Sequence, residues 1–260
     1  MEETKKMNFF QKLYRSLYDF KSYIYFSTLS IGKGIVYLLL ISLITGAAMA
    51  TKQAVLSSGF TKDFKTSFED SIKDFNLSDG IVTVNGDKYT EIKSSHFSVM
   101  FDTGNEKKPE DIKAETAILL QKDQVYVKPY GQEIRSVKYS ALPVKSISRE
   151  DIMSIASDYG KVLLYGPFIL YPIQLFFRGA LYALILTLVG LIIAKVACKV
   201  DTTFGETYNL SLYVVTPIFL ITLVLFLFGW FSSLIIDVAI GAVYLYMAYK
   251  EIALSQKALK

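Results

Sequence analysis

Residues 34–51 read GIVYLLLISLITGAAMAT, and these 18 consecutive residues without a charged side chain decide the class of this 260-residue chain. At 1.5 Å per residue, a helix of this length spans about 27 Å, which is enough to cross the hydrocarbon core of a bilayer. The triplet Ala48-Met49-Ala50 resembles a signal-peptide cleavage site, but the basic segment that precedes the apolar stretch is too long for a signal peptide. We therefore expect a membrane helix over residues 34–51 that is retained as an anchor.

The segment before this helix, residues 1–33, is basic and aromatic. It carries six Lys and Arg residues. Its apolar residues recur at helical spacing, and they are Phe9, Phe10, Leu13, Leu17 and Tyr18. This pattern predicts an amphipathic helix. The helix could lie on the cytoplasmic membrane surface or pack on the other helices of the chain, and the two arrangements are compatible.

Residues 52–160 are polar, and between Lys52 and Lys161 there are 16 basic and 17 acidic residues. Phe64, Phe68, Ile72 and Phe75 are spaced by four, four and three residues, which predicts an amphipathic helix leaving the membrane. Several later stretches have the composition of strands, and they are residues 81–84, 97–101, 117–121, 124–127 and 134–139.

Turn and cap signals divide this polar section further. Asn85-Gly86 is typical of a two-residue hairpin turn, and Lys122-Asp123 lies between two strand candidates. Ser148 followed by Asp151 predicts the capped start of a helix. We expect a small α+β domain with an antiparallel sheet over residues 52–160.

Residues 161–249 return to an apolar composition and predict three more spans. Residues 162–194 contain a single charge, Arg178, and we expect one span that ends before Lys195. Two short spans turning at Arg178-Gly179 are the alternative, although no polar stretch of turn length separates them. Residues 209–228 form the next span, in which Pro217 predicts a helix kink, and residues 233–249 form the last.

The basic residues of the short segments predict the orientation of these four spans. The N-terminal segment has six, the loop of residues 195–208 has two and the tail has three, whereas the short loop around Gly229 has none. Short cytoplasmic loops carry an excess of Lys and Arg. We therefore expect residues 1–33 and the tail of residues 250–260 to be cytoplasmic and residues 52–160 to be extracellular, in a bacterial cytoplasmic membrane.

Arg178 and Asp237 are the two charges embedded in apolar spans. Counted from Lys195 and Lys250 at 1.5 Å per residue, they lie about 25 and 20 Å from the inner surface. Their similar depth predicts an ion pair between the second and fourth spans. Such a pair either holds the two helices in register or serves an ion pathway.

No stretch of the sequence indicates a reaction. Phe101-Asp102-Thr103-Gly104 resembles the loop of aspartic proteases, but the second carboxylate which that chemistry needs is missing, so we expect a turn. The single histidine, His96, and the single cysteine, Cys198, exclude multi-histidine metal sites and an intramolecular disulfide. We predict a protein that is not an enzyme, with no catalytic, cofactor-binding or metal-binding residues, no cofactor and no nucleic-acid partner.

Short motifs in a fixed order carry a resemblance to a known family. They are Phe9-Phe10 with Leu13, Ile31-Gly32-Lys33-Gly34, Leu77-Ser78-Asp79-Gly80, Phe101-Asp102-Thr103-Gly104, and Phe204-Gly205-Glu206-Thr207-Tyr208 followed by Tyr213-Val214-Val215-Thr216-Pro217. With them the chain resembles an uncharacterised family of Gram-positive membrane proteins, some of which are labelled maltodextrin utilization proteins. The last motif is also similar to the membrane region of the Yip-type superfamily, whose members are helical and not enzymes.

Together these features predict an α-helical integral membrane protein of about four spans, with a small extracytoplasmic α+β domain inserted after the first. We expect a non-enzymatic accessory, sensor or scaffold of a transport or envelope complex. The resemblance implies maltodextrin uptake and a partner such as a sugar transporter, besides the lipid bilayer itself. The alternative is a small oligomeric transporter or channel that uses Arg178 and Asp237.

Overall fold

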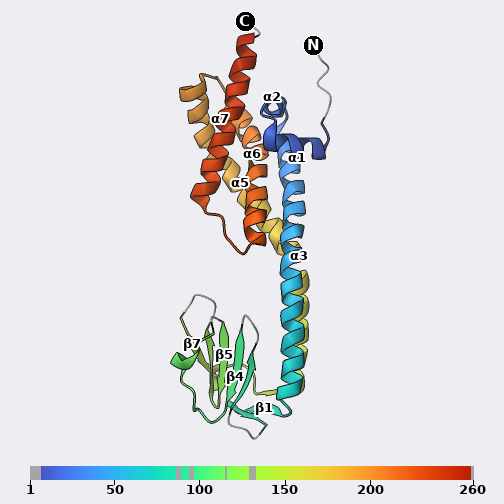
Figure 1. The fold of residues 1–260 in the computed structure, drawn as a ribbon, viewed down its shortest axis with the longest axis vertical. Helices are drawn as coiled ribbons and strands as arrows, with labels where there is room; N and C mark the ends of the chain where they lie inside the picture. The colour runs from blue at the N-terminus through green and yellow to red at the C-terminus, as the bar shows by residue number, and fades with distance from the viewer. Residues whose placement is uncertain (1–6, 86–88, 94–96, 115, 129–132, 259–260) are drawn as a thin grey trace. The chain divides into compact units, whose positions relative to one another are not determined.

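The computed structural model describes residues 7–85, 89–93, 97–114, 116–128 and 133–258, so Gly86 and His96 lie outside the described residues. The chain forms two compact units (Figure 1). Met1–Gln53 and Tyr165–Lys260 make up the first, which we call the helical unit, and Ala54–Leu164 make up the second, the sheet unit.

In the part of the helical unit that the structure describes, there are six α-helices or parts of them. They are α1 (Phe9–Tyr18), α2 (Ser22–Ser27), the first part of α3 (Ile31–Ser71), α5 (Pro167–Ile192), α6 (Phe204–Leu227) and α7 (Leu234–Ala258). A π-helical turn, η3 (Ile193–Cys198), continues α5. The alternative of two short spans turning at Arg178-Gly179 is wrong, because α5 runs through both residues.

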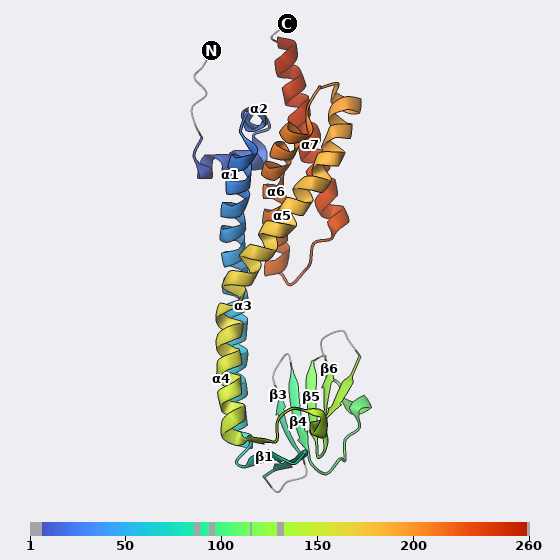
Figure 2. The ribbon, with the colours of Figure 1, turned by 180° about the vertical axis from the view of Figure 1, so that it is seen from behind.

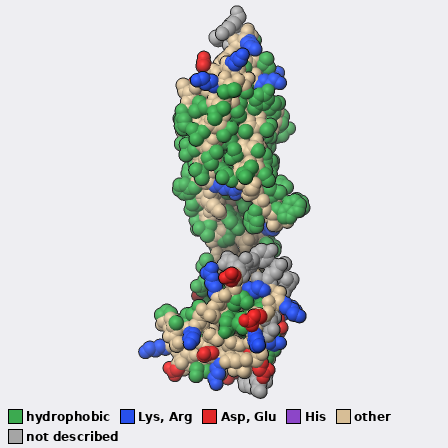
Figure 3. Space-filling view, turned by 90° about the vertical axis from the view of Figure 1, so that its left-hand side faces the viewer, with side chains coloured by type: hydrophobic (Ala, Val, Ile, Leu, Met, Phe, Trp, Pro, Cys, Tyr) green, Lys and Arg blue, Asp and Glu red, His purple; other side chains and the backbone are tan. Residues whose placement is uncertain are grey.

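Three helices are long and apolar enough to cross a membrane: α3, α5 together with η3, and α6. Helix α7, which contains nearly all of the fourth predicted span, is not among them. Figure 3 shows hydrophobic side chains covering the visible face of the helical unit. These features support a membrane location.

The predicted span of residues 34–51 and the predicted helix through Phe75 are one helix, α3, which is 41 residues long. It ends earlier than predicted, at Ser71, because Asn85 caps it. The Asn85 side chain accepts hydrogen bonds from the backbone N–H groups of Lys73 and Asp74, at 2.7 and 2.8 Å, and donates to the Ser71 carbonyl at 2.6 Å. Phe75 then begins a strand instead of extending the helix.

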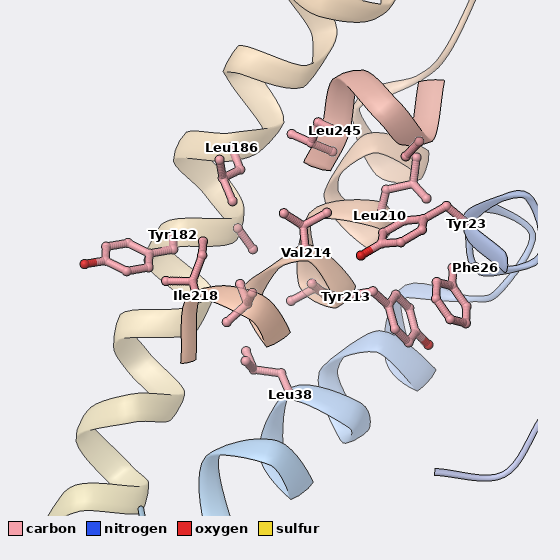
Figure 4. Close-up of a cluster of buried hydrophobic side chains, with 14 of the residues drawn as sticks. Tyr23, Phe26, Leu38, Tyr182, Leu186, Leu210, Tyr213, Val214, Ile218 and Leu245 are labelled. Atoms are coloured by element: carbon pink, nitrogen blue, oxygen red, sulfur yellow. The ribbon is translucent and has the colours of Figure 1, made fainter. Parts of the chain in front are cut away.

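Helix α6 lies at the centre of the helical unit. Every residue from 209 to 219 is buried, and the helix contacts α1, α2, α5 and α7. Figure 4 shows Leu210, Tyr213, Val214 and Ile218 of α6 among side chains of the surrounding helices. A helix that is apolar on all sides is expected to be covered on all sides.

Small residues let these helices approach closely. A Cβ atom placed on Gly46 would come within 2.6 Å of the Pro172 backbone nitrogen, so α3 and α5 touch there through their backbones. A Cβ atom on Gly179 would come within 2.6 Å of the Leu38 side chain and 2.8 Å of the Phe219 side chain.

Helix α1 is amphipathic and packs on helices of its own chain. Phe9 contacts the Tyr37 ring of α3 at 5.5 Å between centroids, and Tyr244 of α7 donates a hydrogen bond to the Leu17 carbonyl at 2.8 Å. The opposite side of α1 leaves aromatic side chains exposed, namely Phe10, Tyr14 and Tyr18. Packing on the chain itself therefore leaves an apolar face available to a membrane surface.

Among its described residues, the sheet unit contains the rest of α3, helix α4 (Arg149–Tyr165) up to Leu164, two 3₁₀ turns, η1 (Pro109–Asp111) and η2 (Tyr139–Ala141), and eight strands. The strands are β1 (Phe75–Ser78), β2 (Ile81–Val84), β3 (Thr90–Lys93), β4 (Ser98–Asp102), β5 (Ala117–Gln121), β6 (Gln124–Lys128), β7 (Arg135–Lys138) and β8 (Ser146–Ser148). Figure 2 shows α4 alongside α3. The predicted cap of α4 is confirmed, because Ser148 and Asp151 exchange hydrogen bonds of 2.8 to 3.1 Å.

Two details of the predicted sheet are wrong. The strands form two sheets, β2-β1-β8 and β3-β4-β5-β6-β7, and β4 pairs with β5 in parallel, so the larger sheet is mixed. The strands on either side of Asn85-Gly86 belong to different sheets. The two-residue hairpin turn is Asp79-Gly80 instead, where both residues have positive φ and Ser78 pairs with Ile81.

We predict opposite effects of one substitution at two glycines of α3. Gly46→Ala should lower the thermal midpoint of the purified protein, because the new Cβ meets the Pro172 backbone, which cannot move aside cheaply. Gly59→Ala is the control, since no atom lies within 4 Å of its Cβ position and alanine favours a helix by about 1 kcal/mol over glycine. It should leave the midpoint unchanged or raise it. Equal midpoints for the two variants would contradict the close approach at Gly46.

Candidate functional site

The structure brings Arg178 of α5 and Asp237 of α7 together. The Arg178 Nη2 atom lies 2.7 Å from Asp237 Oδ2, and the side chains are 29% and 0% exposed. Both belong to the helical unit. Asp237 lies in the first turn of α7, where the helix dipole favours a negative charge.

Two further side chains complete this cluster. The Tyr182 hydroxyl donates to Asp237 Oδ2 at 2.7 Å and accepts from Arg178 Nε at 2.9 Å. The Ser232 hydroxyl donates to Asp237 Oδ1. The carboxylate thus accepts hydrogen bonds from three side chains, and the Arg178 guanidinium also lies over the Tyr182 ring, 5.0 Å from its centroid.

This arrangement suits a clamp between two helices better than a site for a mobile ion. A buried charge is tolerated when it is paired and its remaining lone pairs are satisfied, as they are for Asp237. Sequence reasoning missed Tyr182 and Ser232. The i, i+4 spacing of Arg178 and Tyr182 on one helix was the available signal for the first.

Pro217 lies inside α6 and is buried. Its missing N–H leaves the Tyr213 carbonyl, four residues earlier, without the usual helical hydrogen bond. The helix is continuous through Pro217, and the kink there stays a prediction.

Asp102 ends β4 and anchors the loop that follows it. Its carboxylate is fully buried and accepts hydrogen bonds from the backbone N–H groups of Glu106 and Lys107, at 3.1 and 2.7 Å. Gln121 Nε2 lies 3.5 Å from the same carboxylate. The expected turn at Asp102-Thr103-Gly104 is therefore confirmed.

The sheet unit contains an apolar cavity of about 280 Å³ between α3, α4 and the strands β4 and β5. Its lining contains no charged side chain, and it consists of Phe60, Thr61, Phe64, Phe97, Ser98, Val99, Thr116, Ala117, Ile118, Ile152, Ile155, Ala156, Tyr159, Gly160 and Leu163. Ile155 and Tyr159 are 47% and 67% exposed, so part of the lining is open to the outside. Small-molecule sites have this apolar character and volumes of about 300–1,000 Å³, so the cavity lies just below the lower end of that range.

Two hydroxyl groups of this lining are already bonded within the protein. Thr61 donates to the Ser57 carbonyl at 2.9 Å, and Ser98 donates to Glu91 Oε1 at 2.6 Å. The Ser98 hydroxyl lowers the pKa of the Glu91 carboxyl group by stabilising its charged form. Burial, followed by the hydrogen bond to Glu91, raises the pKa of Tyr89 to about 12. Because its lining contains no charged side chain and these two hydroxyl groups already have partners, the cavity is suited to an apolar, uncharged group.

Sequence reasoning did not find this cavity, because its lining comes from four segments that are separated in the chain. Among the residues that the structure describes, no group of three or more His, Cys, Asp or Glu side chains could hold a metal ion.

We predict that Arg178→Ala destabilises the protein more than Asp237→Ala. Arg178→Ala leaves a fully buried carboxylate without its cation, which costs about 3–5 kcal/mol in buried pairs. Asp237→Ala leaves the Arg178 guanidinium without its anion, and this costs less because the Arg178 side chain is partly exposed to its surroundings. The measurement is the thermal midpoint and the yield of folded protein after detergent extraction. Arg178→Asp combined with Asp237→Arg should recover part of the loss. A double variant that is no more stable than either single variant would argue against the clamp.

We predict that Asp102→Ala destabilises the sheet unit by about 1–3 kcal/mol, since it removes the acceptor of buried hydrogen bonds. Hydrogen–deuterium exchange should become faster in residues 98–121. Asp63→Ala, which removes an exposed carboxylate from α3, is the control and should leave that exchange unchanged. Unchanged exchange in the Asp102 variant would contradict the anchoring role.

Comparison with known proteins places the chain in a family. No curated protein and no solved structure matches it. The model of a family described as "Protein of unknown function (DUF1189)" matches residues 10–249, which include nearly all of both units. The chain therefore belongs to the DUF1189 family of proteins of unknown function.

Proposed function

We propose that this chain is a non-enzymatic protein of the bacterial cytoplasmic membrane with four spans, of which α7 is the fourth. In this proposal both termini are cytoplasmic and the sheet unit is extracellular. Its domains are a cytoplasmic segment (residues 1–33), a first span (34–51), an external domain (52–160), three spans (161–249) and a cytoplasmic tail (250–260).

Contacts within the helical unit support this orientation. Asn209 at the start of α6 donates hydrogen bonds to the carbonyls of Phe26 and Leu29, at 2.7 and 2.8 Å, and Thr207 bonds Tyr249 of α7 at 2.7 Å. The N-terminal segment, the loop before α6 and the second half of α7 therefore share one end of the unit. The lysines and arginines of the short segments belong to these three parts, as the positive-inside rule requires of a cytoplasmic end.

The sheet unit, in our proposal, gives the protein its role as an accessory, sensor or scaffold of a transport or envelope complex. The observation that carries this proposal is the apolar cavity between α3, α4 and the larger sheet. An uncharged lining favours an apolar ligand or an apolar side chain of a partner protein, since a polar group would lose its hydration there without compensation.

The family resemblance adds a narrower proposal, in which the complex is a sugar-uptake system such as a maltodextrin transporter. A sugar itself is a poor match for the cavity, because the lining offers no amide or charged group to its hydroxyls. The chain would then act on a transporter without binding its substrate. The resemblance of residues 204–217 to the Yip-type membrane region, which rests on the sequence motifs alone, would fit a role that is not enzymatic.

A small oligomeric transporter or channel is the second candidate, and it rests on the Arg178–Asp237 pair. It predicts loss of flux in Arg178→Ala or Asp237→Ala at normal protein abundance. The bonding of Asp237 by three side chains favours the clamp instead.

The test of the leading proposal is copurification of the full chain from native membranes in mild detergent, with bound proteins and lipids identified by mass spectrometry. Ile155→Glu places a charge in the cavity lining, and we expect it to remove the bound partner. Ser154→Glu adds the same charge one residue away, at an exposed position outside the lining, and should retain the partner. Equal recovery with both variants, or no partner with the unchanged chain, would overturn the proposal.

A further inference from the structure

A second cavity lies in the helical unit, between α1 and the start of α3. Its volume is about 360 Å³, and its lining combines two lysines with apolar side chains. The lining residues are Phe9, Lys12, Ser30, Gly32, Lys33, Val36, Tyr37 and Leu40.

The two lysines carry positive charge that the described residues do not neutralise. Neither Lys12 nor Lys33 is in an ion pair within the described part of the chain. Burial lowers the pKa of the Lys12 ammonium group, and the charge of Lys33 lowers it further. An anion between the two ammonium groups would relieve this repulsion.

The rest of the lining is apolar and continues along α3. Val36 and Leu40 line the cavity and are 57% and 37% exposed. Leu43 and Ile44 follow at 46% and 49% exposure, and the spacing of 36, 40, 43 and 44 places these side chains on one face of the helix. The basic cavity thus leads directly into an exposed apolar stripe on a helix that could cross a membrane.

We propose that this cavity binds an anionic phospholipid, with its phosphate between Lys12 and Lys33 and an acyl chain along Val36 and Leu40. A free phosphate or a nucleotide would use the lysines but would leave the apolar stripe uncovered. The joining of two cationic groups to an apolar path fits an amphipathic anion with a long hydrocarbon chain.

The test is native mass spectrometry of the purified full chain in a neutral detergent, titrated with phosphatidylglycerol or phosphatidylcholine. We expect one phosphatidylglycerol to bind at low lipid concentration and phosphatidylcholine to bind more weakly. Lys12→Gln with Lys33→Gln should weaken phosphatidylglycerol binding at least about tenfold, because two charge-assisted contacts are lost. The control, Lys21→Gln with Lys257→Gln, makes the same change in net charge outside the cavity lining and should bind as the unchanged chain does.

Two further measurements allow the proposal to be tested even if the variant does not fold. If the Lys12 and Lys33 variant fails to fold, the salt dependence of the unchanged chain decides, since phosphatidylglycerol binding should fall as sodium chloride is raised. Three results would overturn the proposal. They are equal phosphatidylglycerol binding by the variant and its control, no preference for phosphatidylglycerol over phosphatidylcholine, and binding that does not change with the salt concentration. If inorganic phosphate alone binds the chain as tightly as phosphatidylglycerol does, the proposal is overturned in favour of a site for free phosphate.

Discussion

The helical unit depends on the burial of the central part of α6, residues 209–219. In hydrocarbon, lipid tails are as apolar as leucine, so burying apolar surface between helices gains little. Polar side chains of α6 supply the specificity instead, because each forms a hydrogen bond with a different helix. Thr207 is hydrogen-bonded to Tyr249 of α7, Asn209 to the end of α2, and Thr216 to Tyr37 of α3 at 2.6 Å. Rotation of α6 about its axis would break all three interactions together.

Close packing and charge pairing act on the helices around α6. Gly46 brings α3 against α5, and the Arg178–Asp237 pair joins α5 to α7. At the end of α6, Lys52 Nζ donates to the Phe226 and Leu227 carbonyls at 2.6 and 3.0 Å, which are among the carbonyls that a helix end leaves unpaired. Each neighbour of α6 is therefore fixed both to α6 and to another helix.

Features set by neighbouring residues in the sequence could be predicted, and features set by distant ones could not. Apolar length predicted the three helices that are long and apolar enough to cross a membrane, and Ser148 with Asp151 predicted the start of α4 because a cap is a local interaction. Asn85 was misassigned because its side chain serves a helix end 14 residues away instead of a hairpin. The parallel pairing of β4 with β5 has no local signal at all.

The same distinction holds for the candidate sites. Counting residues from the ends of the predicted spans was enough to predict that Arg178 and Asp237 form an ion pair. Ser232 could not be predicted as their partner, since it lies in the loop before α7 and no periodicity governs a loop. The apolar cavity needed the tertiary structure, because it forms only where α3, α4 and two strands meet.

The chain enters and leaves the sheet unit through two helices that touch. A Cβ atom on Gly160 of α4 would come within 2.6 Å of the Thr61 side chain of α3, so the entry and exit segments are in direct contact. All the strands lie between these two points in the sequence. In evolutionary terms the strands thus form an insert between two helices: they can be lengthened, trimmed or exchanged while the contact between α3 and α4 stays the same.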